Sequence, residues 1–287
     1  MANNASTFHN SSDETQHEQD LFFPPEIILL ILQELEGRYA TLLHLSLCCK
    51  LLHAEAQPLL YRSLHVRINY GISIPVVTGP PPKSYIDNPS LAKFIQIIAY
   101  LECIGTGSDK DMRKILSGSF AHYMPNLKTM SLAFECGIPK VFLSGDFQLE
   151  ELSLSGEDYP YDLEAILRDQ KQLQKLKMMT YQHTLPPLPL SICPKLHTLT
   201  ADMLVAGAFL PLHNIHTLIW KSWYFDRPDC LDHHFTKGLN GLRRLCHSLA
   251  VDRPPLQELA KHLKNLQYLA QSIQHICATV LDVNTRS

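Results

Sequence analysis

Leu149-Glu150-Glu151-Leu152-Ser153-Leu154 is a short stretch with apolar residues at its first, fourth and sixth positions. The alternation over its last three residues is typical of a strand with one buried face. The same pattern recurs along the rest of the chain, in copies that begin at Ile95, Leu127, Leu149, Leu173, Leu196, Ile215, Leu242 and, in a weaker form, Leu266. The sequence therefore predicts an internal repeat.

From Leu127 onward the copies begin at intervals of about 19 to 27 residues. A single strand of this kind cannot bury its apolar face alone, whereas stacked copies bury a continuous core. The array resembles a leucine-rich-repeat solenoid. The asparagine or cysteine that this family buries after the strand would fall near Glu135 and Glu157 in two copies, so we expect an irregular array. The alternative is an irregular α/β domain in which the leucine spacing is coincidental.

The segment Phe22–Leu35 predicts a helix that is apolar almost all the way round. Pro24 and Pro25 suit its first turn, and Glu26 complements the helix dipole there. A helix of this kind is buried on more than one side. A module of about 45 residues cannot supply that cover by itself. The segment therefore predicts a partner.

Two more helical patterns follow up to Arg62, the first separated from the initial helix by Gly37 and the second interrupted by Pro58. Residues 21–64 resemble the F-box family, especially its fungal members. The resemblance is carried by three motifs, Phe23-Pro24-Pro25-Glu26-Ile27-Ile28, Leu42-x-x-Leu45-Ser46-x-x-Cys49-Lys50 and Pro58-Leu59-Leu60-Tyr61-Arg62.

The resemblance implies a three-helix module that docks on a Skp-type adaptor and, through it, on a cullin. The whole chain would then be the substrate receptor of an SCF-type cullin–RING ubiquitin ligase, in which the repeat domain holds the target. Such a protein is not an enzyme itself, has no cofactor, and works in the cytoplasm, the nucleus or both. Carried onto this sequence, the adaptor-binding positions are Pro24, Ile27, Ile28, Leu32, Leu43, Leu45 and Lys50.

The predicted fold class is α+β, an N-terminal three-helix F-box followed by an irregular leucine-rich-repeat-like α/β solenoid. Residues 1–20 are polar and acidic, and we expect a disordered tail. The F-box covers 21–65, and the repeat domain covers 91–287. Between them, residues 66–90 contain Gly79-Pro80-Pro81-Pro82 and predict a linker.

Composition argues against several classes of protein. The net charge is −3 and the isoelectric point is near 6.6, which disfavours nucleic acid as a main partner. The chain has no apolar run long enough to span a membrane. Its first residues lack the basic and apolar regions of a secretory signal peptide.

Candidate chemistry is sparse. The 8 cysteines are scattered without a Cys-x-x-Cys pair, as is typical of small buried residues. The 15 histidines are densest at Asp229–His234, where adjacent His233 and His234 point in different directions, so no metal site is predicted. Two alternatives stay open: a hydrolase or metalloprotein that uses the histidines, and an F-box interaction scaffold that works outside the ligase.

One aromatic cluster is a candidate for target binding. Trp220 falls on an inward strand position and predicts a core residue. Just beyond it, Trp223, Tyr224, Phe225 and Arg227 have the composition of an interface hot spot. The alternative for these four residues is packing of the loop against the repeat.

Overall fold

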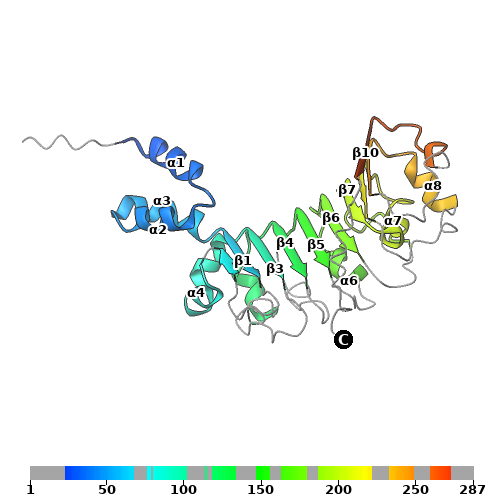
Figure 1. Cartoon of the computed structure of the whole chain (residues 1–287). Helices are drawn as coiled ribbons and strands as arrows, with labels where there is room; N and C mark the ends of the chain where they lie inside the picture. The colour runs from blue at the N-terminus through cyan, green and yellow to red at the C-terminus, as the bar shows by residue number, and fades with distance from the viewer. Residues whose placement is uncertain are drawn as a thin grey trace, which may run out of the picture.

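The computed structural model describes residues 23–67, 76–78, 80–101, 114, 118–133, 147–155, 163–179, 187–221, 233–248 and 259–272. Three helices come first, α1 (Pro25–Glu34), α2 (Tyr39–Ser46) and α3 (Lys50–Leu60). They form a small module at one end of a long curved sheet (Figure 1). The predicted tail, residues 1–20, lies outside the described residues.

The sheet has ten strands in the order β10-β9-β8-β7-β6-β5-β4-β3-β1-β2. Neighbours from β1 to β10 run parallel, and β2 is antiparallel to β1. The strands are β1 (Ser63–Arg67), β2 (Val76–Thr78), β3 (Ile97–Leu101), β4 (Thr129–Ala133), β5 (Glu151–Ser155), β6 (Lys175–Met179), β7 (Thr198–Ala201), β8 (Thr217–Trp220), β9 (Arg244–Ser248) and β10 (Tyr268–Ser272). A parallel sheet in chain order is the architecture of a solenoid.

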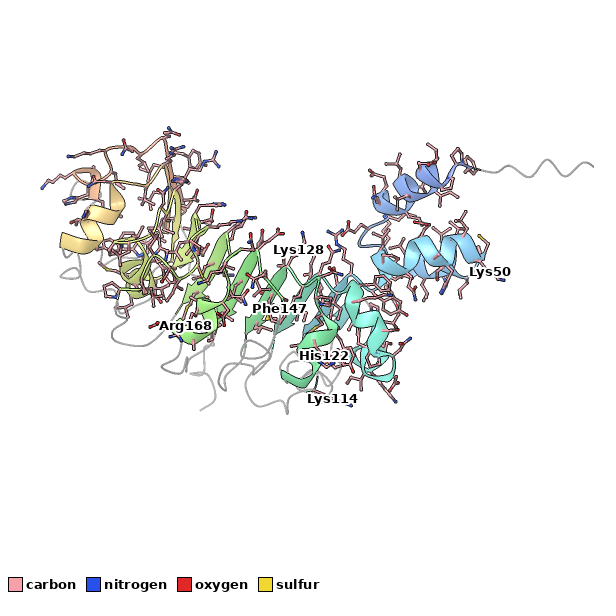
Figure 2. The ribbon with its side chains drawn as sticks, turned by 180° about the vertical axis from the view of Figure 1, so that it is seen from behind. Lys50, Lys114, His122, Lys128, Phe147 and Arg168 are labelled. Atoms are coloured by element: carbon pink, nitrogen blue, oxygen red, sulfur yellow. The ribbon has the colours of Figure 1, made fainter. Side chains whose placement is uncertain are left out.

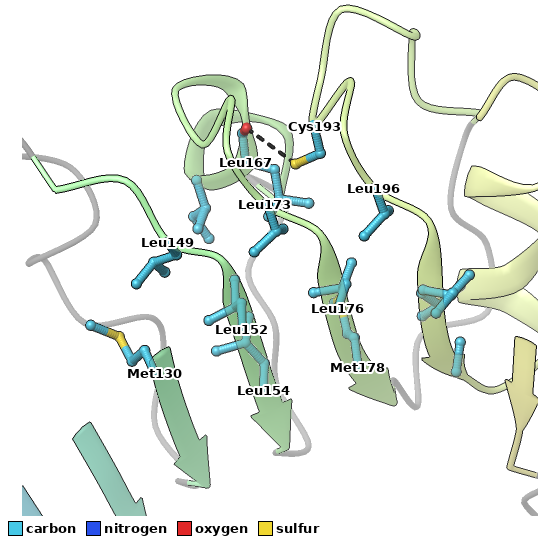
Figure 3. Packing of buried hydrophobic residues seen from close by; sticks show 14 of the residues in the cluster. Met130, Leu149, Leu152, Leu154, Leu167, Leu173, Leu176, Met178, Cys193 and Leu196 are labelled. Atoms are coloured by element: carbon cyan, nitrogen blue, oxygen red, sulfur yellow. Dashed lines mark hydrogen bonds between the residues drawn. The ribbon is translucent and has the colours of Figure 1, made fainter. Parts of the chain in front are cut away.

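The predicted repeat is confirmed, because every copy of the leucine pattern supplies one strand in register with the next. In the first seven copies the central apolar position is buried in the core, whereas in the last copy Leu269 is half exposed. These positions form one buried row, Ile98, Met130, Leu152, Leu176, Leu199, Leu218 and Leu245. Figure 3 shows how Leu152 and Leu176 lie along this row with the leucines that precede each strand. Stacked copies therefore share one core, as the repeat physics requires.

Short helices return the chain from one strand to the next. They are α4 (Pro82–Asp87), η1 (Pro89–Phe94), η2 (Gly118–Tyr123), α6 (Leu163–Arg168), α7 (Met203–Phe209) and α8 (His233–Leu239). In Figure 1, α4 and α6 lie below the sheet and leave its upper face open. Asp202 is the N-cap of α7, where its carboxylate accepts a hydrogen bond of 2.9 Å from the amide of Val205.

Single polar side chains tie consecutive coils together inside the core. Buried Gln170 accepts a 2.9 Å hydrogen bond from the amide of Leu149. The thiol of Cys193 donates to the carbonyl of Leu167 at 3.5 Å (Figure 3). Burial raises the pKa of the Cys193 thiol to about 12, so this group keeps its proton at neutral pH. Positions Glu135 and Glu157, where the family's buried residue was expected, lie outside the described residues.

Residues 66–90 were predicted to be a linker, but their described part contains the end of β1, β2, α4 and the start of η1. Only two residues separate the end of α3 from the start of β1, and α4 lies below the sheet in Figure 1. Tyr85 of α4 is fully buried, and its hydroxyl donates to the carbonyl of Tyr61 at 3.3 Å. Pro81 and Pro82 begin α4 instead of breaking the fold, because a helix tolerates proline in its first turn.

Candidate protein-interaction site

Helix α1 has two apolar faces, and only one of them is covered. The covered face carries Ile28, Leu32 and Leu35, spaced by four and three residues along the helix. Leu32 is 1% exposed. It packs with the other buried residues of the module, Leu42, Ala56 and Leu60. The module therefore has a small core of its own.

The second face of α1 is uncovered. Phe23, Ile27, Leu30 and Ile31, which we call the α1 stripe, recur at the spacing that places residues on one side of a helix. Their exposed fractions are 55%, 42%, 57% and 50%. Leu29 on α1 and Leu43 and Leu47 on α2 and its end add further exposed apolar surface to the module. An exposed apolar patch of this kind marks an interaction site.

The predicted adaptor-binding residues fall into two groups. Pro24, Ile27, Leu43 and Lys50 are exposed, and Figure 2 shows Lys50 at the end of the module remote from the sheet. The others are Ile28 and Leu45, which are half-buried against the module's core, and Leu32, which is fully buried within it. Since Leu32 packs inside the module, it offers no surface to a partner in this conformation.

Sequence reasoning did not single out Leu30 and Ile31, the two residues of α1 most exposed among its aliphatic side chains. The signal that could have found them is their spacing of three and four residues from Ile27. Ile28 and Leu32 are also four residues apart, so spacing alone does not distinguish the covered face from the exposed one. Only the packing of α1 on α3 decides which of the two apolar faces is covered.

The module is joined firmly to the sheet. The carbonyl of Arg62 accepts hydrogen bonds from the amides of Gln96 at 2.8 Å and Ile97 at 3.1 Å, so the second residue after α3 is already part of the first coil. The guanidinium of Arg62 also pairs with the carboxylate of Glu36 at 2.7 Å. These contacts of Arg62 connect the module to the first coil of the sheet.

The open face of the sheet is polar and, near β4 and β5, balanced in charge. Lys128 pairs with Glu150 at 2.9 Å, and the ammonium of Lys175 pairs with the carboxylate of Glu151. Figure 2 shows Lys128 on this face, on the opposite side of the sheet from His122. All four side chains are partly exposed, so each pair adds little to stability.

The other predicted positions have separate outcomes. Trp220 is buried, as predicted, with its ring 5.8 Å from that of Phe235. Trp223, Tyr224, Phe225 and Arg227 lie outside the described residues, as do Asp229–Asp232. In the described ranges, no group of three or more His, Cys, Asp or Glu side chains is placed to hold a metal ion. No helix in those ranges is long and apolar enough to cross a membrane.

By its fold the chain is a leucine-rich-repeat-like solenoid preceded by a three-helix module, an architecture that presents extended binding surfaces. No family model matches the chain, and no curated protein matches it. Among solved structures, an internalin from Listeria monocytogenes is similar with a TM-score of 0.33 and 13% identity. That match covers 70% of this chain and 64% of the internalin chain, less than two thirds of its length. The solenoid assignment rests on the strand order and register of this chain itself.

Proposed function

We propose that the protein is the substrate receptor of an SCF-type cullin–RING ubiquitin ligase, in which the three-helix module binds a Skp-type adaptor. The α1 stripe carries this proposal. It leaves three large apolar side chains of α1, and that of Phe23 just before the helix, in water, while the other face of α1 is already packed. The F-box-like motifs of residues 21–64 supply the identity of the partner.

The stripe has the chemistry of a helix that docks in an apolar groove. Such helices present anchors three, four and seven residues apart, as Ile27, Leu30 and Ile31 do with Phe23. Complete burial of one large apolar side chain contributes roughly 1.5 to 3 kcal/mol. Several anchors together offset the entropy lost on association. Leu43 on α2 and Leu47 just after it are further exposed apolar side chains of the module.

The role of the sheet in this proposal is to hold a target protein at a fixed place relative to the adaptor. The end of α3 is anchored to the first coil, because only two residues lead into β1 and the carbonyl of one of them, Arg62, is bonded to the amides of Gln96 and Ile97. The receptor does no chemistry and binds no cofactor. It raises the effective concentration of the target's lysines near the ubiquitin-carrying enzyme.

Co-purification with purified Skp-type adaptor and cullin tests the proposal. We expect the full chain to retain the adaptor, and to retain cullin only when the adaptor is present. Retention of the adaptor without cullin would contradict the ligase role and favour an interaction scaffold. Failure of the folded chain to retain the adaptor would contradict the proposal altogether.

A further inference from the structure

The open face of the sheet changes in charge along the solenoid. From residue 171 to residue 272, the only carboxylate among the described side chains is that of Asp202, which is buried and caps α7. Over the same span the described basic residues are Lys171, Lys175, Lys177, Lys195, Lys221, Lys237, Arg243, Arg244, Lys261 and Lys264. Of these, Lys175 and Lys177 lie in β6, Arg244 lies in β9 and Arg243 directly precedes β9. None of the strands from β6 to β10 contains a carboxylate, so this half of the sheet carries only positive charges.

Several of these cations stand on the open face without a carboxylate partner. Lys177 and Arg244 occupy outward strand positions, since they alternate with buried Leu176 and Leu245. Arg243 precedes β9 and is exposed. Among the described residues no carboxylate pairs with Lys177, Arg243 or Arg244. Their charges remain available to an anion.

A pocket of about 500 Å³ opens beside these cations. It is lined by Asn214, His216, Gly241, Arg243, Asn265 and Gln267. The six residues come in pairs from the turns before β8, β9 and β10. The lining holds one guanidinium, one imidazole and three carboxamides, but no carboxylate. This set of donors suits the oxygens of an anionic group.

The register of the repeat builds the pocket. The amide of Arg243 donates to the carbonyl of His216 at 2.9 Å, and the amide of Gln267 donates to the carbonyl of Arg243 at 2.8 Å. His216, Arg243 and Gln267 therefore occupy equivalent positions in three consecutive coils. Strands in a sheet lie about 4.8 Å apart, so their side chains stand close enough to contact one ligand group together.

Tyr268 completes the surface. It is in register with Arg244 on β10 and is 55% exposed. Tyrosine and arginine are the residues most enriched at energetic centres of interfaces. The row that runs from Lys175 through Arg244 to Tyr268 combines positive charge with an aromatic ring.

We infer that this surface, formed by Lys177, Arg243, Arg244, Tyr268 and the pocket lining, binds an extended acidic segment of the target protein. Crossing from β6 to β10 spans about 19 Å, which about six extended residues cover. One glutamate or aspartate of that segment would enter the pocket. The assignment of this segment to a ligase target rests on the proposed function. The binding of an acidic segment rests only on the charges of the surface.

An extended acidic protein segment fits this surface better than a nucleic acid does. From β6 toward β4 the open face also carries carboxylates, since Glu151 pairs with Lys175 and Glu150 pairs with Lys128. A nucleic acid that continued along the concave face would meet those carboxylates.

Fluorescence anisotropy on the full chain, alone and bound to adaptor, tests the inference. The probe is a fluorescein-labelled decapeptide of alternating glutamate and serine, with a glutamine–serine decapeptide as its uncharged counterpart. We expect the acidic peptide to bind and the uncharged one not to bind. An R243E/R244E variant should weaken binding of the acidic peptide about tenfold or more, whereas the K83E control on remote α4 should leave it unchanged.

Equal binding of the acidic peptide by wild type and R243E/R244E would overturn the inference. It would also be overturned if the acidic peptide did not bind, or if a labelled ten-nucleotide oligouridine bound more tightly. Adaptor binding by R243E/R244E is measured as well, so that a failure of the peptide inference can be distinguished from a failure of the proposed function. If R243E/R244E loses the peptide but keeps the adaptor, the result supports the binding surface on the sheet and leaves the module unaffected. If the wild-type chain binds the peptide but not the adaptor, the proposed function is contradicted and the inference about the sheet stands.

Discussion

An I27D/L30D variant is expected to lose adaptor affinity by about 100-fold or more while its fold stays intact. Both side chains belong to the α1 stripe and are 42% and 57% exposed, so an aspartate at either place stays in water in the free protein. In the complex the same carboxylates would be buried in an apolar groove without a partner, which is strongly unfavourable. Isothermal titration calorimetry with purified adaptor measures the loss.

The matched control is L212D. Leu212 is 50% exposed, similar to the two stripe residues, but it lies in the repeat domain after α7. We expect L212D to bind the adaptor like wild type. A thermal unfolding midpoint for I27D/L30D close to that of wild type would show that the module remains folded. Equal loss of binding in L212D and I27D/L30D would contradict the assignment of the stripe.

Leu199→Ala is expected to destabilise the solenoid by about 2 to 5 kcal/mol. Leu199 is fully buried in the middle of the core row, between Leu176 and Leu218. Truncation leaves a cavity that the neighbouring coils cannot fill, because their strands are held in register. Chemical denaturation followed by circular dichroism measures the change in the free energy of unfolding.

Leu269→Ala supplies the comparison for that variant. Leu269 holds the equivalent position on β10, in register with Leu245, but it is 48% exposed. We expect its truncation to cost well under half as much, since most of the lost contact area faces water. Equal costs at the two positions would contradict the continuous core as described.

The leucine pattern predicted the strands well because each copy follows one local rule. Leu152 and Leu154 alternate with serines, and only a strand buries such a pair on one face. Strand β1 was missed although Leu64 and Val66 share this alternation. Its copy has Tyr61 where the others have leucine or isoleucine, and the prolines that follow suggested a linker.

The candidate site was predicted less completely, and the reason is physical. Because the first helix is apolar almost all the way round, the sequence predicted that one of its faces would need a partner. It could not say which face, since Leu30 and Leu32 are the same residue type. Only tertiary packing leaves the first at 57% exposure and the second at 1%. The pocket was missed because its residues lie in three separate turns. Aligning the copies would have placed His216, Arg243 and Gln267 in one column.

Hydrogen–deuterium exchange of the full chain with and without the Skp-type adaptor tests the central claim most directly. We predict that the adaptor slows exchange of the backbone amides of α1 and leaves those of β4 to β9 unchanged, because the α1 stripe is the surface that becomes buried. Adaptor-dependent protection confined to the sheet, with α1 exchanging as fast as before, would contradict the account.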